Sequence, residues 1–282
     1  VKEANPHALI LAEHYGDPSD WLQGDEWDSV MNYDAFMEPV TWFLTGMEKH
    51  SDEYRGDLLG NADYFMNAMK HHMANMMTPS LQTAMNQLSN HDHSRFLTRT
   101  NHKVGRVGQL GSRAAEEGVS LAVMREAIIM QMTWPGAPTL YYGDEAGLCG
   151  FTDPDNRRTY PWGREKRDLI NFYREMIQIH RKSLALRKGS IKMLKAEPDL
   201  LAYGRFWGNE QIVVIINNSD HLKEVRVPVW QAEVAEGHNM ARGMYSYEDG
   251  YIGEFEEYIV KEGNISLMMG KKSAIVLKNK KW

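Results

Sequence analysis

The chain has 282 residues, enough for one large or two modest domains with a sizeable core. Its composition is that of an ordinary globular protein, with 43% hydrophobic and 25% charged residues, and its net charge of −6 argues against nucleic acid or an anionic membrane as a general partner. Cys149 is the only cysteine, which excludes an intrachain disulfide framework and a cysteine metal cluster, and no apolar run approaches the ~18 residues of a membrane span.

The first predicted element is a strand over residues 8–12 that ends at a carboxylate. Ala8–Ala12 is continuously apolar, which suits a strand in a parallel sheet with helices on both sides. Glu13 follows directly and is therefore expected at the carboxyl-terminal tip of the strand. The chain opens at Val1 and runs almost at once into this strand, so we expect it to be the middle of a longer protein rather than a signal peptide or a domain start.

A second strand is predicted over residues 29–33, and helical patterns follow it. A helix is expected over 36–44, a polar loop over 46–60, and an amphipathic helix over 63–77. The last of these repeats apolar residues at helical spacing, and its methionines are expected to fill the core. The stripe consists of Phe65, Met66, Met69, Met73 and Met76.

A third strand, Thr83–Leu88, runs into the polar sequence Ser89-Asn90-His91-Asp92. The tip has no glycine or proline, so an ordinary tight turn explains it poorly. A histidine beside an aspartate at a strand end can be a titrating pair, a pair of hydrogen-bonding groups for a hydroxylated ligand, or part of a metal site. It can equally be a satisfied loop histidine with an aspartate that caps the next turn, and the dipeptide alone does not decide among these.

The next elements repeat the alternation of strand and helix. A long loop over 99–117 leads to a nearly all-apolar helix over 119–132, a strand over 138–142 and an amphipathic helix over 164–186. Four strand–helix units in succession predict a parallel α/β sheet. Four units with long loops after the strands fit half of a (β/α)8 barrel, whose chemistry lies at the carboxyl ends of the strands.

Beyond Leu186 the pattern changes to short β-type runs separated by polar turns, which predicts an antiparallel β-sandwich domain. We therefore divide the chain into a partial barrel, residues 1–187, and a C-terminal β domain, residues 188–282. The predicted strands are Gly189–Leu194, Leu200–Trp207, Gln211–Asn217, Glu224–Val229, Ile265–Met269 and Ser273–Leu277.

With these groups placed at strand ends, the chain resembles the α-amylase family, glycoside hydrolase family 13, and most of all its neopullulanase, cyclomaltodextrinase and maltogenic-amylase branch. Four stretches in the family's order and spacing carry the resemblance, which covers about residues 8–190. They are Leu11-Ala12-Glu13 with Trp21–Tyr33 after it, Ser89-Asn90-His91-Asp92, the strand and tip Gly136–Glu145, and Asp153-Pro154-Asp155-Asn156-Arg157-Arg158 with Pro161-Trp162.

The resemblance implies catalytic roles for three residues. Glu13 would be the general acid that protonates the glycosidic oxygen and then the base that activates water. Such a group must hold its proton near neutral pH, which burial and nearby negative charge favour. Asp92 would be the third carboxylate, and it would hydrogen-bond hydroxyls of the sugar at the cleavage point together with His91. These bonds can strengthen as the ring distorts toward an oxocarbenium ion.

The resemblance also implies residues that contact substrate. Asn90 belongs to the same motif as the His-Asp pair. Tyr15 would be a stacking platform on the leaving-group side, where the branch usually has tryptophan, and this departure bears on substrate preference. Asp153 and Arg157 would line the far donor side.

One catalytic part is missing from the sequence. A retaining glycosidase needs a second carboxylate about 5–5.5 Å from the first, as nucleophile. The family carries it in Gly-x-Arg-x-Asp on the preceding strand, whereas Gly111–Ala115 reads Gly-Ser-Arg-Ala-Ala. We therefore expect a C-terminal fragment that starts just before the fifth barrel strand and is inactive alone. Its exposed half barrel would need the missing N-terminal half, another copy of itself, or strong packing on the β domain.

Two alternative functions stay open. A metal-dependent barrel hydrolase would use the spacing His91-x-His93, although the neighbouring Arg95 is a poor companion for a cation. A non-catalytic amylase-like binding or partner module is the second alternative. Relatives of that kind usually lose the acid or the His-Asp pair, and this chain keeps Glu13, His91 and Asp92.

The expected substrate is an α-glucan with α-1,4 and also α-1,6 bonds, as in maltodextrins, cyclodextrins or pullulan, and the choice among them stays open, as does hydrolysis against transglycosylation. No cofactor is expected, because no oxygen cluster is specific enough to indicate the calcium that occurs in the family. The absence of cysteine pairs favours the cytoplasm, with secretion left open. Asp144 and Glu145 are expected to form ion pairs or caps, and Trp134, Trp162 and Trp207 are expected to be packing residues rather than sugar platforms.

Overall fold

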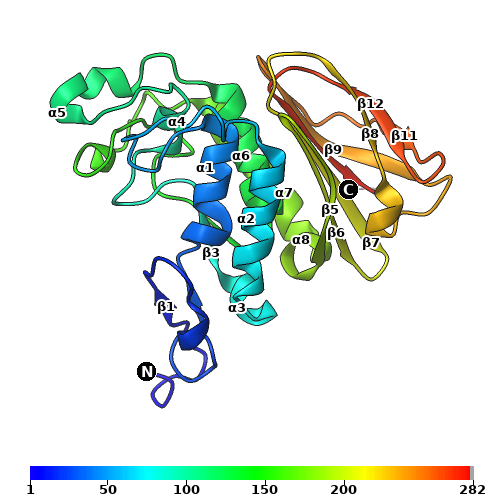
Figure 1. Ribbon diagram of the computed structural model, residues 1–282, viewed down its shortest axis with the longest axis horizontal. Helices are drawn as coiled ribbons and strands as arrows, with labels where there is room; N and C mark the ends of the chain where they lie inside the picture. Colours follow the sequence, from blue (N-terminus) through cyan, green and yellow to red (C-terminus); the bar gives the residue numbers. More distant parts are fainter. Residues whose placement is uncertain (280–282) are drawn as a thin grey trace.

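The computed structural model, drawn in Figure 1, describes residues 1–279. Its first part contains four short parallel strands. They are β1 (Leu11–Ala12), β2 (Ser29–Val30), β3 (Met85–Gln87) and β4 (Ala137–Thr139). β1 pairs with β2 and β3 pairs with β4, and a parallel bridge from Met31 to Met85 joins the two pairs. The strands therefore lie in sequence order, as in one section of a (β/α)8 barrel, and the predicted fold class is confirmed. Regular pairing covers only two or three residues of each predicted strand.

Helices lie where the apolar periodicity places them, and local capping fixes their ends. The Asn61 side chain accepts a hydrogen bond from the Tyr64 amide at 3.0 Å and so begins α2. The predicted helix over 164–186 is in fact two helices, because Ser183 caps the second one through the Leu186 amide at 3.1 Å. The helices are α1 (Glu38–Thr45), α2 (Ala62–Ala74), α3 (Thr78–Thr83), α4 (Phe96–Arg99), α5 (Val107–Leu110), α6 (Leu121–Thr133), α7 (Arg167–Lys182) and α8 (Leu184–Lys188), and a π-helical turn over Tyr33–Met37 precedes α1.

The second part of the chain is antiparallel and begins where α8 ends. Its large sheet has the order β10-β9-β13-β7-β6-β5, with β11 paired to β9, and β8 and β12 form a separate pair. The six predicted strands are all present, but β9, β10 and β11 were missed because charged residues and glycines interrupt their apolar pattern. The strands are β5 (Ser190–Glu197), β6 (Leu200–Trp207), β7 (Glu210–Asn217), β8 (Lys223–Val227), β9 (Asn239–Tyr247), β10 (Gly250–Ile252), β11 (Glu257–Ile259), β12 (Ile265–Met269) and β13 (Ser273–Lys278).

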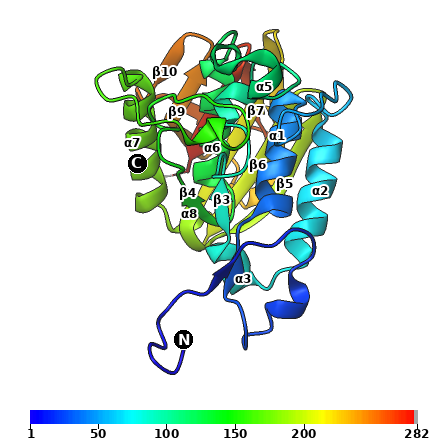
Figure 2. The same cartoon turned by 90° about the vertical axis from the view of Figure 1, so that its left-hand side faces the viewer.

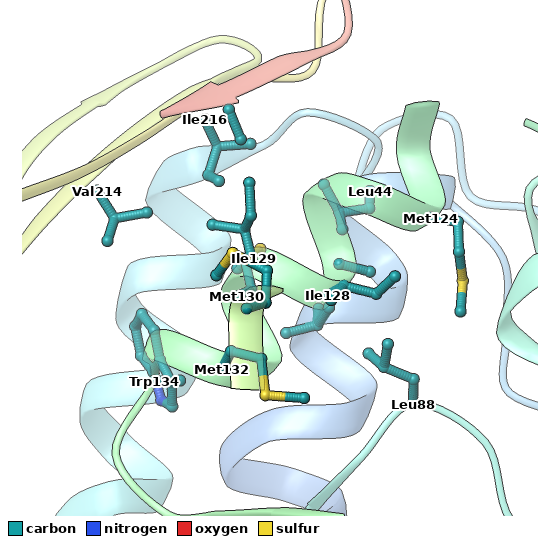
Figure 3. Close-up of a cluster of buried hydrophobic side chains, with 14 of the residues drawn as sticks. Leu44, Leu88, Met124, Ile128, Ile129, Met130, Met132, Trp134, Val214 and Ile216 are labelled. Atoms are coloured by element: carbon teal, nitrogen blue, oxygen red, sulfur yellow. The ribbon is translucent and has the colours of Figure 1, made fainter. Parts of the chain in front are cut away.

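The large sheet is buried on both faces, and β7 shows why its sequence is continuously apolar. Successive side chains of a strand point to opposite faces. Val213 and Ile215 pack in the core that β8 and β12 cover, whereas Val214 and Ile216 pack against the helices. Figure 3 shows Ile129 of α6 on the side of the helix toward Val214 and Ile216. The helices and the sheet therefore share one hydrophobic core.

Buried polar groups reinforce this junction. Arg205 on β6 donates hydrogen bonds to the carbonyls of Thr133, Leu186 and Gly189 at 2.5, 3.0 and 2.9 Å. Asn218 donates to the Phe43 carbonyl at the end of α1 at 3.1 Å. The barrel section thus packs on the β domain, which is one of the three ways in which we expected it to be stabilised. The other two, a missing half and self-association, stay predictions, as does the division at residue 187 into separate domains.

The segment before β2 lies at the margin of the molecule. Figures 1 and 2 both show the N-terminal segment and β1 projecting from the end of the helical layer. In residues 1–279 no helix has the length and apolar character needed to cross a membrane.

Candidate active site

The tips of β1 and β3 bring together the three residues predicted to be catalytic. Glu13 follows β1, and His91 and Asp92 lie on the segment that follows β3. The ligand atoms of all three lie within 4.8 Å of one another. The His91 Nε2 is 3.7 Å from the Glu13 Oε1 and 3.4 Å from the Asp92 Oδ1. The predicted convergence at one edge of the parallel sheet is therefore present, although the roles of these residues stay predictions.

Asn90 is buried and builds the tip rather than facing solvent. Its side-chain oxygen accepts hydrogen bonds from the amides of Asp92 and His93 at 3.0 and 2.9 Å, a local turn that the asparagine side chain closes. Its side-chain nitrogen donates to the Tyr33 hydroxyl at 3.0 Å. The residue thus fixes the direction of His91 and Asp92, and its predicted contact with substrate stays a prediction.

Tyr33 is a site residue that the sequence analysis did not single out. Its hydroxyl donates to the Glu13 Oε1 at 3.0 Å while it accepts from Asn90. Burial raises the pKa of the Tyr33 phenol, so the group remains a proton donor to the carboxylate. The two hydrogen bonds that link Asn90, Tyr33 and Glu13 thereby orient the candidate acid. Tyr33 lies just past the tip of β2, in the same kind of position that singled out Glu13, and this was the available signal.

Tyr15 lies beside Glu13, but its ring is already in contact with protein. It stacks on Tyr33 with ring centroids 4.3 Å apart and an interplanar angle of 4°. The ammonium group of Lys49 lies 4.7 Å from the ring centroid. The Tyr15 hydroxyl hydrogen-bonds with the His93 Nε2 at 3.1 Å. At least one ring face is therefore covered, and the predicted stacking on a sugar stays a prediction for the rest of the ring.

His93 does not join His91 as a second ligand. It is fully buried beside Tyr15, and its ring lies edge-on to that of His50 with centroids 4.8 Å apart. Burial, followed by the positive charge of Arg99, lowers the pKa of His93 to about 2. The imidazole is therefore neutral in the folded protein.

The neutral state of His93 predicts a pH dependence of stability. The unfolded chain binds a proton at this residue below pH ~6.5 and the folded chain does not, so stability is full above pH 6.5 and falls as the pH drops toward 2. Between pH 7.5 and pH 5 the loss from this group is about 2 kcal/mol. A His93→Gln variant should lack this part of the loss in urea unfolding at the two pH values. Burial also lowers the pKa of His102 and His180, but both residues are present in the wild type and in the variant. An equal loss of stability in the two proteins would therefore contradict the prediction.

Asp153 and Arg157 lie on a loop that is fastened to the tip of β3. The Asp153 amide donates to the Asp92 carbonyl at 3.0 Å, and the Arg157 Nε donates to the His91 carbonyl at 2.9 Å. The same nitrogen lies 2.7 Å from the Asp153 carboxylate, and an Arg157 terminal nitrogen lies 3.8 Å from the Asp92 Oδ1. Asn156 strengthens the fastening through the carbonyls of Asn90 and His93 at 3.0 and 2.8 Å. The structure thus brings both predicted donor-side residues to the cluster.

The cluster is open to a ligand. The side chains of Glu13, His91 and Asp92 are 41%, 44% and 39% exposed. Asp92 places a second carboxyl group beside Glu13, whereas the described residues do not bury Glu13 as expected. Chemically, the arrangement offers a carboxyl group held by a phenol, next to a carboxylate and an imidazole that can bind hydroxyl groups.

The remaining predicted residues fall into two groups. Asp144 forms a buried ion pair with Arg95 at 3.0 Å, as expected for a structural role, and Trp134 is fully buried. The prediction that Trp162 packs in the core is wrong, because its side chain is 79% exposed. The Trp207 side chain is about half exposed. Their positions on a loop and at a strand end carry them away from the core.

Comparison with known proteins finds a matching family and several similar proteins. The family description "Alpha amylase, catalytic domain" matches residues 1–251. The chain is 30% identical to the amylopullulanase of Thermoanaerobacter thermohydrosulfuricus, over 98% of this chain and 18% of that protein. It is 34% identical to neopullulanase 2 of Thermoactinomyces vulgaris, over 81% and 35%. The solved debranching enzyme of Nostoc punctiforme is 26% identical with a TM-score of 0.76, over 98% and 53%. The chain thus spans about a third or less of these curated relatives.

Proposed function

The chain belongs to the α-amylase family, and on this premise we propose that it supplies the acid–base and sugar-binding side of the active site of a retaining α-glucan hydrolase. The observation that carries the proposal is the convergence of Glu13, His91 and Asp92 within 4.8 Å at the open edge of the parallel strands. This edge is where barrel enzymes of this type carry their chemistry.

Glu13 is the general acid and then the general base of the proposed mechanism. Tyr33 holds one carboxyl oxygen, which leaves the other free to meet the glycosidic oxygen. Asp92 and His91 bind hydroxyls of the reacting sugar, and those bonds strengthen as positive charge develops on the ring.

The proposed substrates are maltodextrins, cyclodextrins or pullulan, cleaved at α-1,4 and also α-1,6 bonds. Two similar proteins named amylopullulanase and neopullulanase 2 support this choice. Asp153 and Arg157 line the donor side beside the sugar bound by Asp92, and Tyr15 borders the leaving-group side. Asn90 orients Asp92, because its side-chain oxygen accepts a hydrogen bond from the Asp92 amide.

The proposed mechanism requires a nucleophile that the family motif does not place in these 282 residues. Gly111–Ala115 has alanine where the motif has aspartate. We therefore assign the nucleophile to a polypeptide segment outside the printed sequence, which would also complete the barrel and cover the exposed side of Glu13. The partial barrel, 1–187, and the β domain, 188–282, would act together as one half of that enzyme, in the cytoplasm.

The purified 282-residue chain alone should release no measurable glucose or maltose from a maltodextrin, because no nucleophile completes the pair. The control is the same assay after addition of a polypeptide that carries the family's nucleophile segment. Hydrolysis by the chain alone would contradict the assignment. In that case Asp92, which has a carboxylate oxygen within 4.8 Å of one of Glu13, would be the nucleophile instead.

A metal-dependent hydrolase remains the second candidate, because Glu13, His91 and Asp92 could also hold a divalent cation. The predicted chelate His91-x-His93 is not formed among the described residues, since His93 contacts Tyr15 and His50 instead. Metal analysis of the purified protein, with a His91→Ala variant as the control, separates this candidate from the glycosidase. A non-catalytic amylase-like module would bind maltodextrin but stay inactive when the nucleophile segment is added.

A further inference from the structure

Trp162 is the most exposed aromatic side chain of residues 1–279, with 79% of its surface open. Its ring centroid lies 4.4 Å from that of Tyr160, at an interplanar angle of 48°. Aromatic rings carry much of the apolar area that proteins bury at interfaces, so an exposed indole beside a second ring offers a surface on which a ligand can stack.

The backbone that carries Trp162 is held firmly on its amino-terminal side. The Tyr142 hydroxyl donates to the Arg158 carbonyl at 2.7 Å. The Arg158 guanidinium donates to the carboxylates of Asp155 and Glu116 at 2.8 and 2.7 Å. Trp162 therefore comes directly after an ordered loop. Binding of a ligand to its ring costs little conformational entropy, because the loop is already ordered.

A cavity of about 360 Å³ opens beside Tyr160, between this loop and the first turns of α7. Glu165 is held in place because its Oε1 accepts a hydrogen bond from the Gly163 amide at 3.0 Å. The Asn171 side-chain oxygen accepts a hydrogen bond from the Arg174 guanidinium at 3.2 Å, and its amide nitrogen adds two N–H donors to the lining. The lining consists of Tyr160, Glu165, Arg167, Ile170, Asn171 and Arg174.

The combination fits a sugar better than a protein surface. A pyranose ring has one face of C–H groups, which packs on an aromatic ring, and a rim of hydroxyls, which donate and accept hydrogen bonds. A stable protein interface buries about 800 Å² per partner around an apolar centre. In the cavity only Ile170 is aliphatic, and the other groups are polar or ionised.

We propose that Trp162, Tyr160 and the adjoining polar cavity bind a second stretch of α-glucan, outside the candidate active site. The inference rests on the proposed function for the choice of an α-linked sugar. Tyr160 follows Arg157 by three residues, so their Cα atoms lie within about 10 Å. A glucan chain that passes Arg157 therefore needs only a few more sugar units to reach the Trp162 surface, which would hold long substrates at the enzyme.

The test measures binding of maltoheptaose to the full chain by titration calorimetry, in an Asp92→Ala background that weakens sugar binding at the candidate active site. We expect binding in this background, about tenfold or more weaker when Trp162→Ala is added. Trp162→Phe, which keeps a ring, should retain most of the affinity. Trp230→Ala is the matched control, because this tryptophan is 60% exposed and lies on the β domain. Cellohexaose, a β-linked glucan, should bind more weakly than maltoheptaose.

Three results would overturn the inference: no binding in the Asp92→Ala background, unchanged affinity after Trp162→Ala, or an equal loss after Trp230→Ala. Each variant is checked by its thermal melt, and Asn171→Ala provides a second variant on the cavity side. Hydrolysis by the completed enzyme tests the proposed function separately. If hydrolysis fails while Trp162-dependent binding persists, only the proposed function falls, and the reverse result removes only this inference.

Discussion

Replacing Glu13 by glutamine should lower the kcat of the completed enzyme on maltotetraose by about 10²–10⁴-fold, because glutamine cannot protonate the leaving oxygen. The Tyr33 hydroxyl can still donate to the amide oxygen, so the position of the side chain is retained. The loss should be much smaller on α-maltosyl fluoride, whose leaving group needs little help from an acid. Initial rates on the two substrates measure the difference.

Two further variants make this test specific. Asp92→Asn should slow both substrates, since it removes a bond to the sugar ring and not to the leaving group. Glu145→Gln changes a carboxylate at the tip of the strand region that contains β4 and should leave the rates within about twofold, because Glu145 lies outside the cluster of Glu13, His91 and Asp92. Equal losses for Glu13→Gln on both substrates would exclude a role in leaving-group protonation.

Replacing Arg205 by alanine should destabilise the chain by about 3 kcal/mol, the largest stability effect we expect from a single polar residue. Arg205 is 1% exposed and donates to three carbonyls of the helical part, those of Thr133, Leu186 and Gly189. Burial lowers the pKa of Arg205 to about 10, so the group is still protonated at pH 7. Its removal leaves buried carbonyls without donors and opens a cavity at the junction.

Urea unfolding at pH 7 measures this effect, and Arg226→Ala is the matched control. Arg226 is also an arginine of the β domain, but its ion pair with Glu262 lies at the surface and is worth less than about 1 kcal/mol. A loss for Arg205→Ala no larger than that of the control would show that the carbonyl contacts do not stabilise the junction.

The parts of the site that follow from strand order could be predicted from the sequence. Glu13 and the His91-Asp92 pair each end an apolar strand, and parallel strands in succession place their carboxyl ends at one edge. The strand pairings and the bridge from Met31 to Met85 show that the four strands lie in sequence order. This order brings Glu13 next to His91 and Asp92.

The parts that depend on side-chain direction could not be predicted. The position of Tyr33 after β2 marked it as a candidate, but its contact with Glu13 was not predictable, because Tyr33 begins a π-helical turn, Tyr33–Met37, and residue spacing does not predict such a turn. Tyr15 was expected to be available for stacking, yet Tyr33 covers one face of its ring. Trp162 was expected to pack, because tryptophan is usually mostly buried, and only the course of its loop reveals the exposure.

The place of β13 in the large sheet has a consequence for synthesis of the protein. This strand, Ser273–Lys278, lies between β7 and β9, and its Ala274 and Val276 fill the core shared with the helices. A ribosome makes the helices first, at about 5–20 residues per second. The helical layer then waits for roughly 140 residues after α6, many seconds of translation, before the strand that closes its core has emerged. During that interval the nascent chain presents apolar surface, which makes it a natural client of chaperones that act at the ribosome.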